Sequence, residues 1–103
     1  MNEEIKNRIE TMIRSKKVFL FLKGTPESPK CGFSLRVIQI LKNLHVDFGY
    51  CNVLEEDDIR QGIKEYADWP TIPQLYIDGK FIGGCDIAEE LYRSGELQKC
   101  ISK

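Results

Sequence analysis

The first half of the chain carries hydrophobic patterns typical of alternating helices and strands. Apolar residues at positions 5, 9, 12 and 13 share one helical face, which predicts a first helix over about residues 3–15. The apolar run at residues 18–22 predicts a strand that is covered on both faces. A second helical pattern extends over about residues 33–43, and residues 48–53 indicate a second strand. Strand, helix and strand in this order predict a parallel pair with a right-handed crossover.

The second half adds one helix, a hairpin and a final helical region. Asp57 and Asp58 open a helical pattern that stops before Trp69, because the residue preceding a proline avoids helical geometry. The segment QLYIDGKFI at residues 74–82 is typical of a hairpin around an Asp-Gly turn. A helical pattern then covers about residues 87–101, with an expected break at Ser94-Gly95. The whole order predicts an α/β fold with a four-stranded mixed sheet and helices on both faces.

Composition and charge narrow the class of protein. A chain of 103 residues, 42% hydrophobic and 30% charged, suits one globular domain spanning residues 1–103. The net charge of −1 provides no basic excess, so no nucleic-acid partner is expected. The apolar run at residues 18–22 is far shorter than the roughly 20 residues of a spanning helix, so no membrane partner is expected either. The acidic N-terminus shows no targeting pattern, which favours a cytoplasmic protein; a trimmed protein of the mitochondrial matrix would look the same.

Four cysteines are spread along the chain without a C-x-x-C pair, at positions 31, 51, 85 and 100. With a single histidine, His45, expected in an exposed helix-to-strand connection, this spacing argues against a structural zinc site. A disulfide scaffold is not expected, because the chain can build its own core and shows no export signal. Cys51 lies in a strand pattern and Cys100 near the C-terminus, so neither is given a role. The remaining interpretation of the cysteines is thiol chemistry at one site.

Cys31 is the candidate for that site. It follows a loop rich in Gly, Pro and Ser at residues 23–30 and directly precedes a predicted helix. The free N–H groups and the dipole of a helix N-terminus favour a thiolate, and Lys23 and Lys30 add positive charge if the loop folds back. The alternative is a small buried hydrophobic residue, as many lone cysteines are. The position after a Gly- and Pro-rich loop favours the reactive interpretation.

Three segments together resemble a known family. They are KGTPESPKCGFS at residues 23–34, WPTIPQL at residues 69–75 and GGCD at residues 83–86. In this order and spacing they resemble the monothiol, CGFS-type glutaredoxins, over essentially the whole chain. The resemblance implies a thioredoxin fold, which agrees with the element order, and glutathione as the ligand.

The residues that follow Cys31 limit its chemistry. In dithiol relatives a second cysteine at position 34 attacks the mixed disulfide, which the hydroxyl of Ser34 cannot do. Ser34 is equally suited to satisfying backbone donors in the first helical turn. Gly32 lacks a Cβ and lets a sulfur or a cluster approach closely. Phe33 either packs against the protein or shields the thiol from water.

The resemblance also implies a glutathione site. Lys23 and Arg60 are the candidates for the glycyl carboxylate, although Arg60 could equally be a solvated helix charge. The γ-glutamyl end is assigned to the helix start that contains Gly84, Cys85 and Asp86, where Asp86 could instead be only an N-cap.

The middle of that site is assigned to Thr71, Ile72 and Pro73. A cis bond before Pro73 would let Ile72 pair with a peptide-like ligand, and the alternative is simply the start of a strand. Two interpretations of Cys85 stay open: a resolving thiol, or a compact residue in a turn. Trp69 is expected to pack in the core or in a loop.

These residues support functional hypotheses of different classes. One is an iron–sulfur carrier: the Cys31 thiolates of two chains and two glutathiones would supply the four thiolates of a [2Fe-2S] cluster, shared within a homodimer. The resemblance implies BolA-type proteins and apo iron–sulfur proteins as further partners. The alternative is a glutathione-dependent thiol-disulfide oxidoreductase that removes glutathione from proteins by a monothiol mechanism. A non-catalytic interaction domain would leave the thiol unexplained.

Overall fold

The computed structural model describes residues 1–102 and contains a central sheet covered by helices. Lys103, the last residue of the predicted 1–103 domain, lies outside the described residues. The elements, in chain order, are α1 (Glu3–Ser15), β1 (Val18–Leu22), α2 (Gly32–Asn43), β2 (Gly49–Asn52), α3 (Asp57–Ala67), β3 (Gln74–Ile77), β4 (Lys80–Gly83), α4 (Cys85–Ser94) and α5 (Glu96–Ser102). Within residues 1–102, none of these helices is long and apolar enough to cross a membrane.

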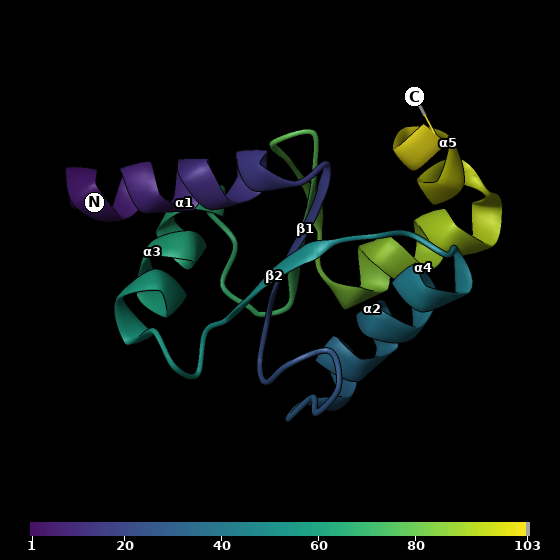
Figure 1. Ribbon diagram of the computed structural model, residues 1–103, viewed down its shortest axis with the longest axis horizontal. Helices are drawn as coiled ribbons and strands as arrows, with labels where there is room; N and C mark the ends of the chain where they lie inside the picture. The colour runs from purple at the N-terminus through teal and green to yellow at the C-terminus, as the bar shows by residue number, and fades with distance from the viewer. Residues whose placement is uncertain (103) are drawn as a thin grey trace.

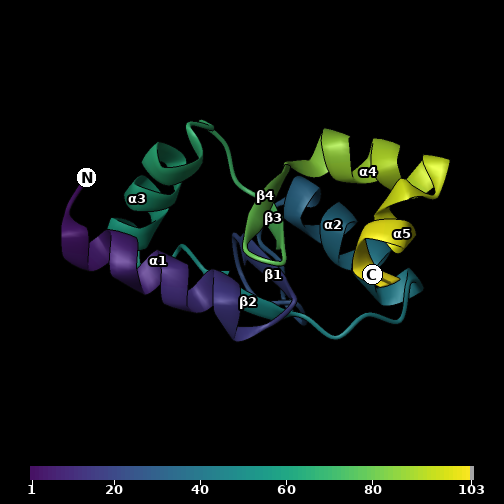
Figure 2. The ribbon, with the colours of Figure 1, turned by 90° about the horizontal axis from the view of Figure 1, so that it is seen from above.

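The sheet is mixed, as the sequence predicts. Its four strands follow the order β2-β1-β3-β4; β1 pairs with β2 in parallel, and the other two pairs are antiparallel. Helices α1 and α3 cover one face, while α2, α4 and α5 lie on the other side (Figures 1 and 2). This arrangement is the thioredoxin fold that the resemblance implies.

The apolar β1 strand explains why the fold has three layers. All five of its residues are buried, and successive side chains point to opposite faces of the sheet. Val18, Leu20 and Leu22 join the hydrophobic cluster formed with α2, α4 and α5. Phe19 and Phe21 join the second cluster, formed with α1 and α3. One strand therefore contributes to a hydrophobic core on each face, which is the packing that its uninterrupted hydrophobicity predicts.

The predicted boundaries differ from the structure by one or two residues. Helix α2 begins at Gly32 rather than Phe33, and β2 is shorter than the predicted residues 48–53. Helix α4 begins at Cys85 rather than at residue 87, because Gly84 provides the extended N-cap backbone. The expected break is confirmed at Gly95, whose φ of 83° is left-handed and stops α4.

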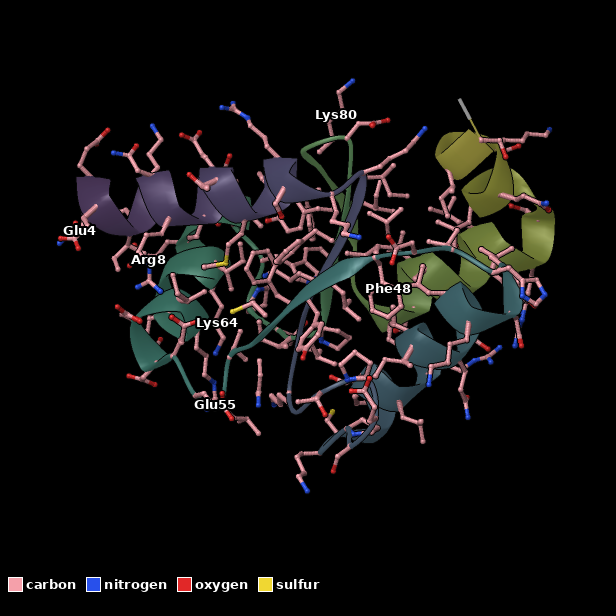
Figure 3. The ribbon with its side chains drawn as sticks, viewed as in Figure 1. Glu4, Arg8, Phe48, Glu55, Lys64 and Lys80 are labelled. Carbon is pink, nitrogen blue, oxygen red and sulfur yellow. The ribbon has the colours of Figure 1, made fainter. Side chains whose placement is uncertain are left out.

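The sheet topology brings three loops together at one end of the strands. Since β3 is antiparallel to β1, the start of β3 lies beside the end of β1, and the end of β4 lies there too. The β3–β4 turn with Lys80 lies at the opposite end of the molecule from the loop with Glu55, which follows β2 (Figure 3). The backbone N–H of Gly24 donates to Asn52 Oδ1 at 2.9 Å and joins the loops after β1 and β2. Segments that are far apart in the sequence therefore meet beside Cys31.

Candidate functional site

Cys31 lies at the N-cap of α2, outside both hydrophobic clusters and partly exposed. Partial burial opposes its ionisation, but this effect is outweighed by the backbone N–H groups of Ser34 and Phe33, the charge of Lys23 and the Ser34 hydroxyl. The net effect lowers the pKa of the Cys31 thiol below its ordinary value. The structure places Cys31 at a helix N-terminus, as the sequence predicts.

Ser34 is fully buried directly behind this thiol. The backbone N–H of Lys23 donates to Ser34 Oγ at 3.2 Å, so the hydroxyl joins the end of β1 to the first turn of α2. The same hydroxyl favours the Cys31 thiolate. Ser34 thus satisfies a backbone donor, although that donor is Lys23 after β1 and not an N–H of the first helical turn, and it also stabilises the anion.

A groove of about 450 Å³ opens beside Cys31. Most of the predicted site residues line it: Lys23, Cys31, Phe33, Thr71, Ile72, Pro73, Gly84, Cys85 and Asp86. Phe33 is 63% exposed, so it does not pack into the core. The structure therefore gathers residues from the β1–α2 loop, the loop before β3 and the start of α4 into one cavity.

The structure adds a second cation of α3, Lys64, to the predicted Arg60. Arg60, assigned to a carboxylate of the ligand, is not among the lining residues of the groove, whereas Lys64 is. Lys64 follows Arg60 by one helical turn on the same face and lies between α3 and the strands (Figure 3). The buried Nε of Arg60 has no hydrogen-bond partner within residues 1–102. Helical periodicity from Arg60 was the signal that could have found Lys64.

At the groove, the loop before β3 packs closely against the residue that precedes α4. The Ile72–Pro73 peptide bond is cis, as the resemblance implies. A Cβ at Gly84 would lie 3.3 Å from Pro73 O and 3.4 Å from Trp69 Nε1, so a larger residue would press on this loop. The Trp69 ring packs against Phe81 with centroids 5.6 Å apart, yet it also lines the groove, which the packing interpretation missed.

Cys85 differs electrostatically from Cys31 although both line the groove. Burial, followed by the charges of Glu89 and Asp86, raises the pKa of the Cys85 thiol. Cys85 is a free thiol at the first position of α4. Its role as a resolving thiol stays a prediction, and its ionisation is less favourable than that of Cys31.

The remaining candidates lie away from the groove. His45 is exposed in the α2–β2 connection, as expected. Cys51 is buried in β2 and Cys100 packs beside the cluster on the α2 side. Within residues 1–102, no three side chains of metal-ligating type are grouped together.

The sheet order and the thiolate-favouring Cys31, which lines the same groove as Pro73, define a class: a thioredoxin-fold protein with a thiolate-favouring cysteine in a groove. The family model described as Glutaredoxin matches residues 18–82. The chain therefore belongs to the glutaredoxin family. Its relatives are monothiol members, in agreement with Ser34 at the position of the second cysteine of dithiol members.

Two relatives illustrate the similarity. The chain is 52% identical to the chloroplastic monothiol glutaredoxin-S14 of Arabidopsis thaliana over 100% of its own length and 60% of that protein. It is also 52% identical to a monothiol glutaredoxin of Synechocystis, over 98% of its length and 94% of the relative. The chain thus spans less than two thirds of some relatives and nearly all of others. Relatives are chloroplastic, mitochondrial and bacterial, so the family occupies several compartments.

Solved structures agree with the fold. The reduced apo GrxS14 of poplar superposes with a TM-score of 0.84 at 54% identity, covering 95% of this chain and 90% of that one. A buckwheat glutaredoxin in complex with glutathione has a TM-score of 0.84 at 25% identity, covering 99% of this chain and 94% of that one.

Proposed function

We propose that this chain binds glutathione and, with a second copy of itself, carries a [2Fe-2S] cluster for delivery to other proteins. The observation that carries the proposal is a single partly exposed, thiolate-favouring Cys31 beside a groove with charged groups at separate positions. Ser34 in place of a second cysteine leaves that thiolate available as a ligand rather than as half of a disulfide.

The groove matches the charges of glutathione, which has two carboxylates and one amine at neutral pH. Lys23 and Lys64, together with Arg60 one helical turn before Lys64, supply cations for the glycyl carboxylate. The first turn of α4 offers backbone N–H groups to the γ-glutamyl carboxylate, and Asp86 offers a carboxylate to its amine. Support comes from the buckwheat glutaredoxin of similar fold, which was solved as a complex with glutathione.

The cluster is cargo that two copies would share. A [2Fe-2S] cluster usually takes four thiolates, and one chain with one glutathione offers two, so two of each complete the set. Phe33 and Leu35, in the first turns of α2, are 63% and 42% exposed beside the thiol. These apolar side chains suit a contact with the second copy. Because glutathione is held noncovalently, the cluster would be transferable, with BolA-type proteins and apo iron–sulfur proteins as partners and the cytoplasm as the proposed compartment.

Anaerobic reconstitution tests the proposal. The wild-type protein, incubated with iron, sulfide and reduced glutathione, is expected to gain visible absorption and to become a dimer. Cys31→Ser should lose both, while Cys100→Ser, which removes a thiol outside the groove, should keep both. A colourless monomer under these conditions would contradict the carrier function, as would a cluster that forms without glutathione.

A glutathione-dependent oxidoreductase is the second candidate, favoured by the lowered pKa of Cys31. Its thiolate would attack the glutathione sulfur of a protein–glutathione disulfide and release the protein thiolate, which takes up a proton. A second glutathione thiolate would then attack the Cys31–glutathione disulfide and release oxidised glutathione and the Cys31 thiolate. Rapid release of glutathione from a glutathionylated peptide by a protein that stays colourless would favour this function over the first.

A further inference from the structure

Gln74, the first residue of β3, places a polar group inside an apolar layer. Its side chain is fully buried and lies on the same face of the strand as Tyr76, because side chains two positions apart share a face. Tyr76 belongs to the hydrophobic cluster between the sheet and helices α1 and α3. Burial of a carboxamide there is unfavourable unless its hydrogen bonds are made.

The carboxamide of Gln74 makes hydrogen bonds on both of its sides. Nε2 donates to Trp69 O at 3.2 Å and to Thr71 O at 3.3 Å, while Oε1 accepts from the Tyr76 hydroxyl at 3.2 Å. Backbone carbonyl oxygens can only accept, so the orientation of the amide is fixed by its partners. Burial raises the pKa of Tyr76, which keeps its hydroxyl protonated as a donor at neutral pH.

The two carbonyls belong to the segment that forms one wall of the groove. Trp69 and Thr71 line the groove, and Ile72 and cis-Pro73 follow directly. Gln74 therefore holds this backbone from the protein interior at two carbonyl groups, one on each side of Pro70. The same segment is held at its start, where Trp69 N donates to Lys64 O at 3.0 Å.

We propose that Gln74, itself oriented by Tyr76, is a positioning residue that preforms the wall of residues 69–72 for the ligand. Gln74 is shielded from the groove and acts only through the backbone that it holds. A preformed wall binds more tightly because the ordering of the loop is not paid for at the moment of binding. The inference rests on the proposed function in taking glutathione as the ligand.

The test uses S-methylglutathione, which cannot form a disulfide with Cys31, titrated into the full chain and followed by NMR. Gln74→Met keeps the volume and removes all three hydrogen bonds, and Gln74→Glu removes the two donors. Both variants are expected to weaken binding about ten-fold, because a flexible wall must be ordered by the ligand. The rate of Cys31 alkylation by iodoacetamide should change less than about two-fold, since its thiolate is stabilised from the α2 side.

A matched pair of tyrosines separates positioning from general stability. Tyr76→Phe removes the hydroxyl that orients Gln74 but keeps the donors of Gln74, so binding should weaken by about three-fold. Tyr66→Phe removes a hydrogen bond of similar length, to Glu10 Oε2 at 3.3 Å, outside the groove. Its binding should equal that of the wild type.

The outcomes distinguish a failure of the positioning role of Gln74 from a failure of the proposed function. A folded Gln74→Met protein that binds S-methylglutathione like the wild type overturns the positioning role. If both Gln74 variants fail to fold, the tyrosine pair decides, and equal binding by Tyr76→Phe and Tyr66→Phe overturns it. A wild-type protein that does not bind S-methylglutathione at all contradicts the proposed function instead.

Discussion

Cys31 and Cys51 belong to the same fold, yet their thiols have opposite chemistry. Cys31 caps α2, is partly exposed and has a lowered pKa, because N–H groups and Lys23 outweigh its partial burial. Cys51 pairs with Phe21 inside the sheet, where burial and then the charge of Glu56 raise its pKa to about 12. The sequence alone shows two lone cysteines. The contrast teaches that position relative to helix ends and to the core decides which thiol can react.

The largest expected effect is the difference in reactivity between these two thiols. In the native protein at pH 7, iodoacetamide should modify Cys31 faster than Cys51 by a factor of about 10³ or more, because the thiolate is scarce and enclosed at Cys51. Mass spectrometry of peptides over a time course measures both rates. Cys31→Ser should remove the fast phase. Comparable rates at the two positions would contradict the comparison.

A smaller effect is expected when the hydroxyl behind Cys31 is removed. Ser34→Ala takes away a group that favours the thiolate, so the pKa of Cys31 should rise and its alkylation at pH 7 should slow by about three- to ten-fold. The two proteins should react at similar rates at high pH, where both thiols are ionised. The backbone N–H of Lys23 also loses its acceptor, which should lower the free energy of unfolding by about 1–2 kcal/mol.

The matched control for this change is Ser28→Ala, in the exposed part of the same loop. It should leave the pH profile of Cys31 alkylation unchanged. If Ser34→Ala also leaves the profile unchanged, the stabilisation of Cys31 comes from the backbone and Lys23 alone.

The smallest effect is expected at the charge beside Cys51. The thiol of Cys51 donates to Glu56 Oε2 at 3.5 Å, and Glu56 also pairs with Arg8, which lies between α1 and α3 (Figure 3). Glu56→Gln should lower the pKa of Cys51 while the thiol stays buried, so its alkylation should remain slow. Since the ion pair is half-exposed, urea unfolding should show a loss of only about 0.5 kcal/mol.

Glu55→Gln, on the neighbouring exposed carboxylate, provides the control and should change neither quantity. A Glu56→Gln protein in which Cys51 reacts as fast as Cys31 would show that charge, and not burial, protects this thiol. That result would overturn burial as the explanation for the different reactivities of Cys31 and Cys51.

The structure shows where reasoning from the sequence succeeds. The apolar run at residues 18–22 and the helical spacing before and after it predict β1, α1 and α2 to within two residues, because burial imposes the period of each element. The placement of Cys31 at the start of α2 follows from the same pattern. The cis bond and the lining of the groove by Asp86 agree with what the resemblance implies.

The two features that the sequence did not show, Lys64 in the groove and Gln74 behind it, have a common physical cause. Lys64 lies on the same helical face as Arg60, and only the packing of α3 against the sheet shows that Lys64 lines the groove. Gln74 looks like an ordinary strand residue in the sequence, because its partners at Trp69 and Thr71 become neighbours only after the chain turns at Pro70.

The sequence by itself determined the order of helices and strands, the family motifs and the placement of Cys31 directly before the second helix. Hydrophobic periodicity and backbone preferences are local, so they can be read along the chain. Only the tertiary structure decided which loops meet at the groove, which lysine lines it and which buried side chains support it from behind. The lining of the groove joins residues far apart in the sequence, and the hydrogen bonds of Gln74 join near neighbours that meet only because the chain turns at Pro70 and packs against the sheet.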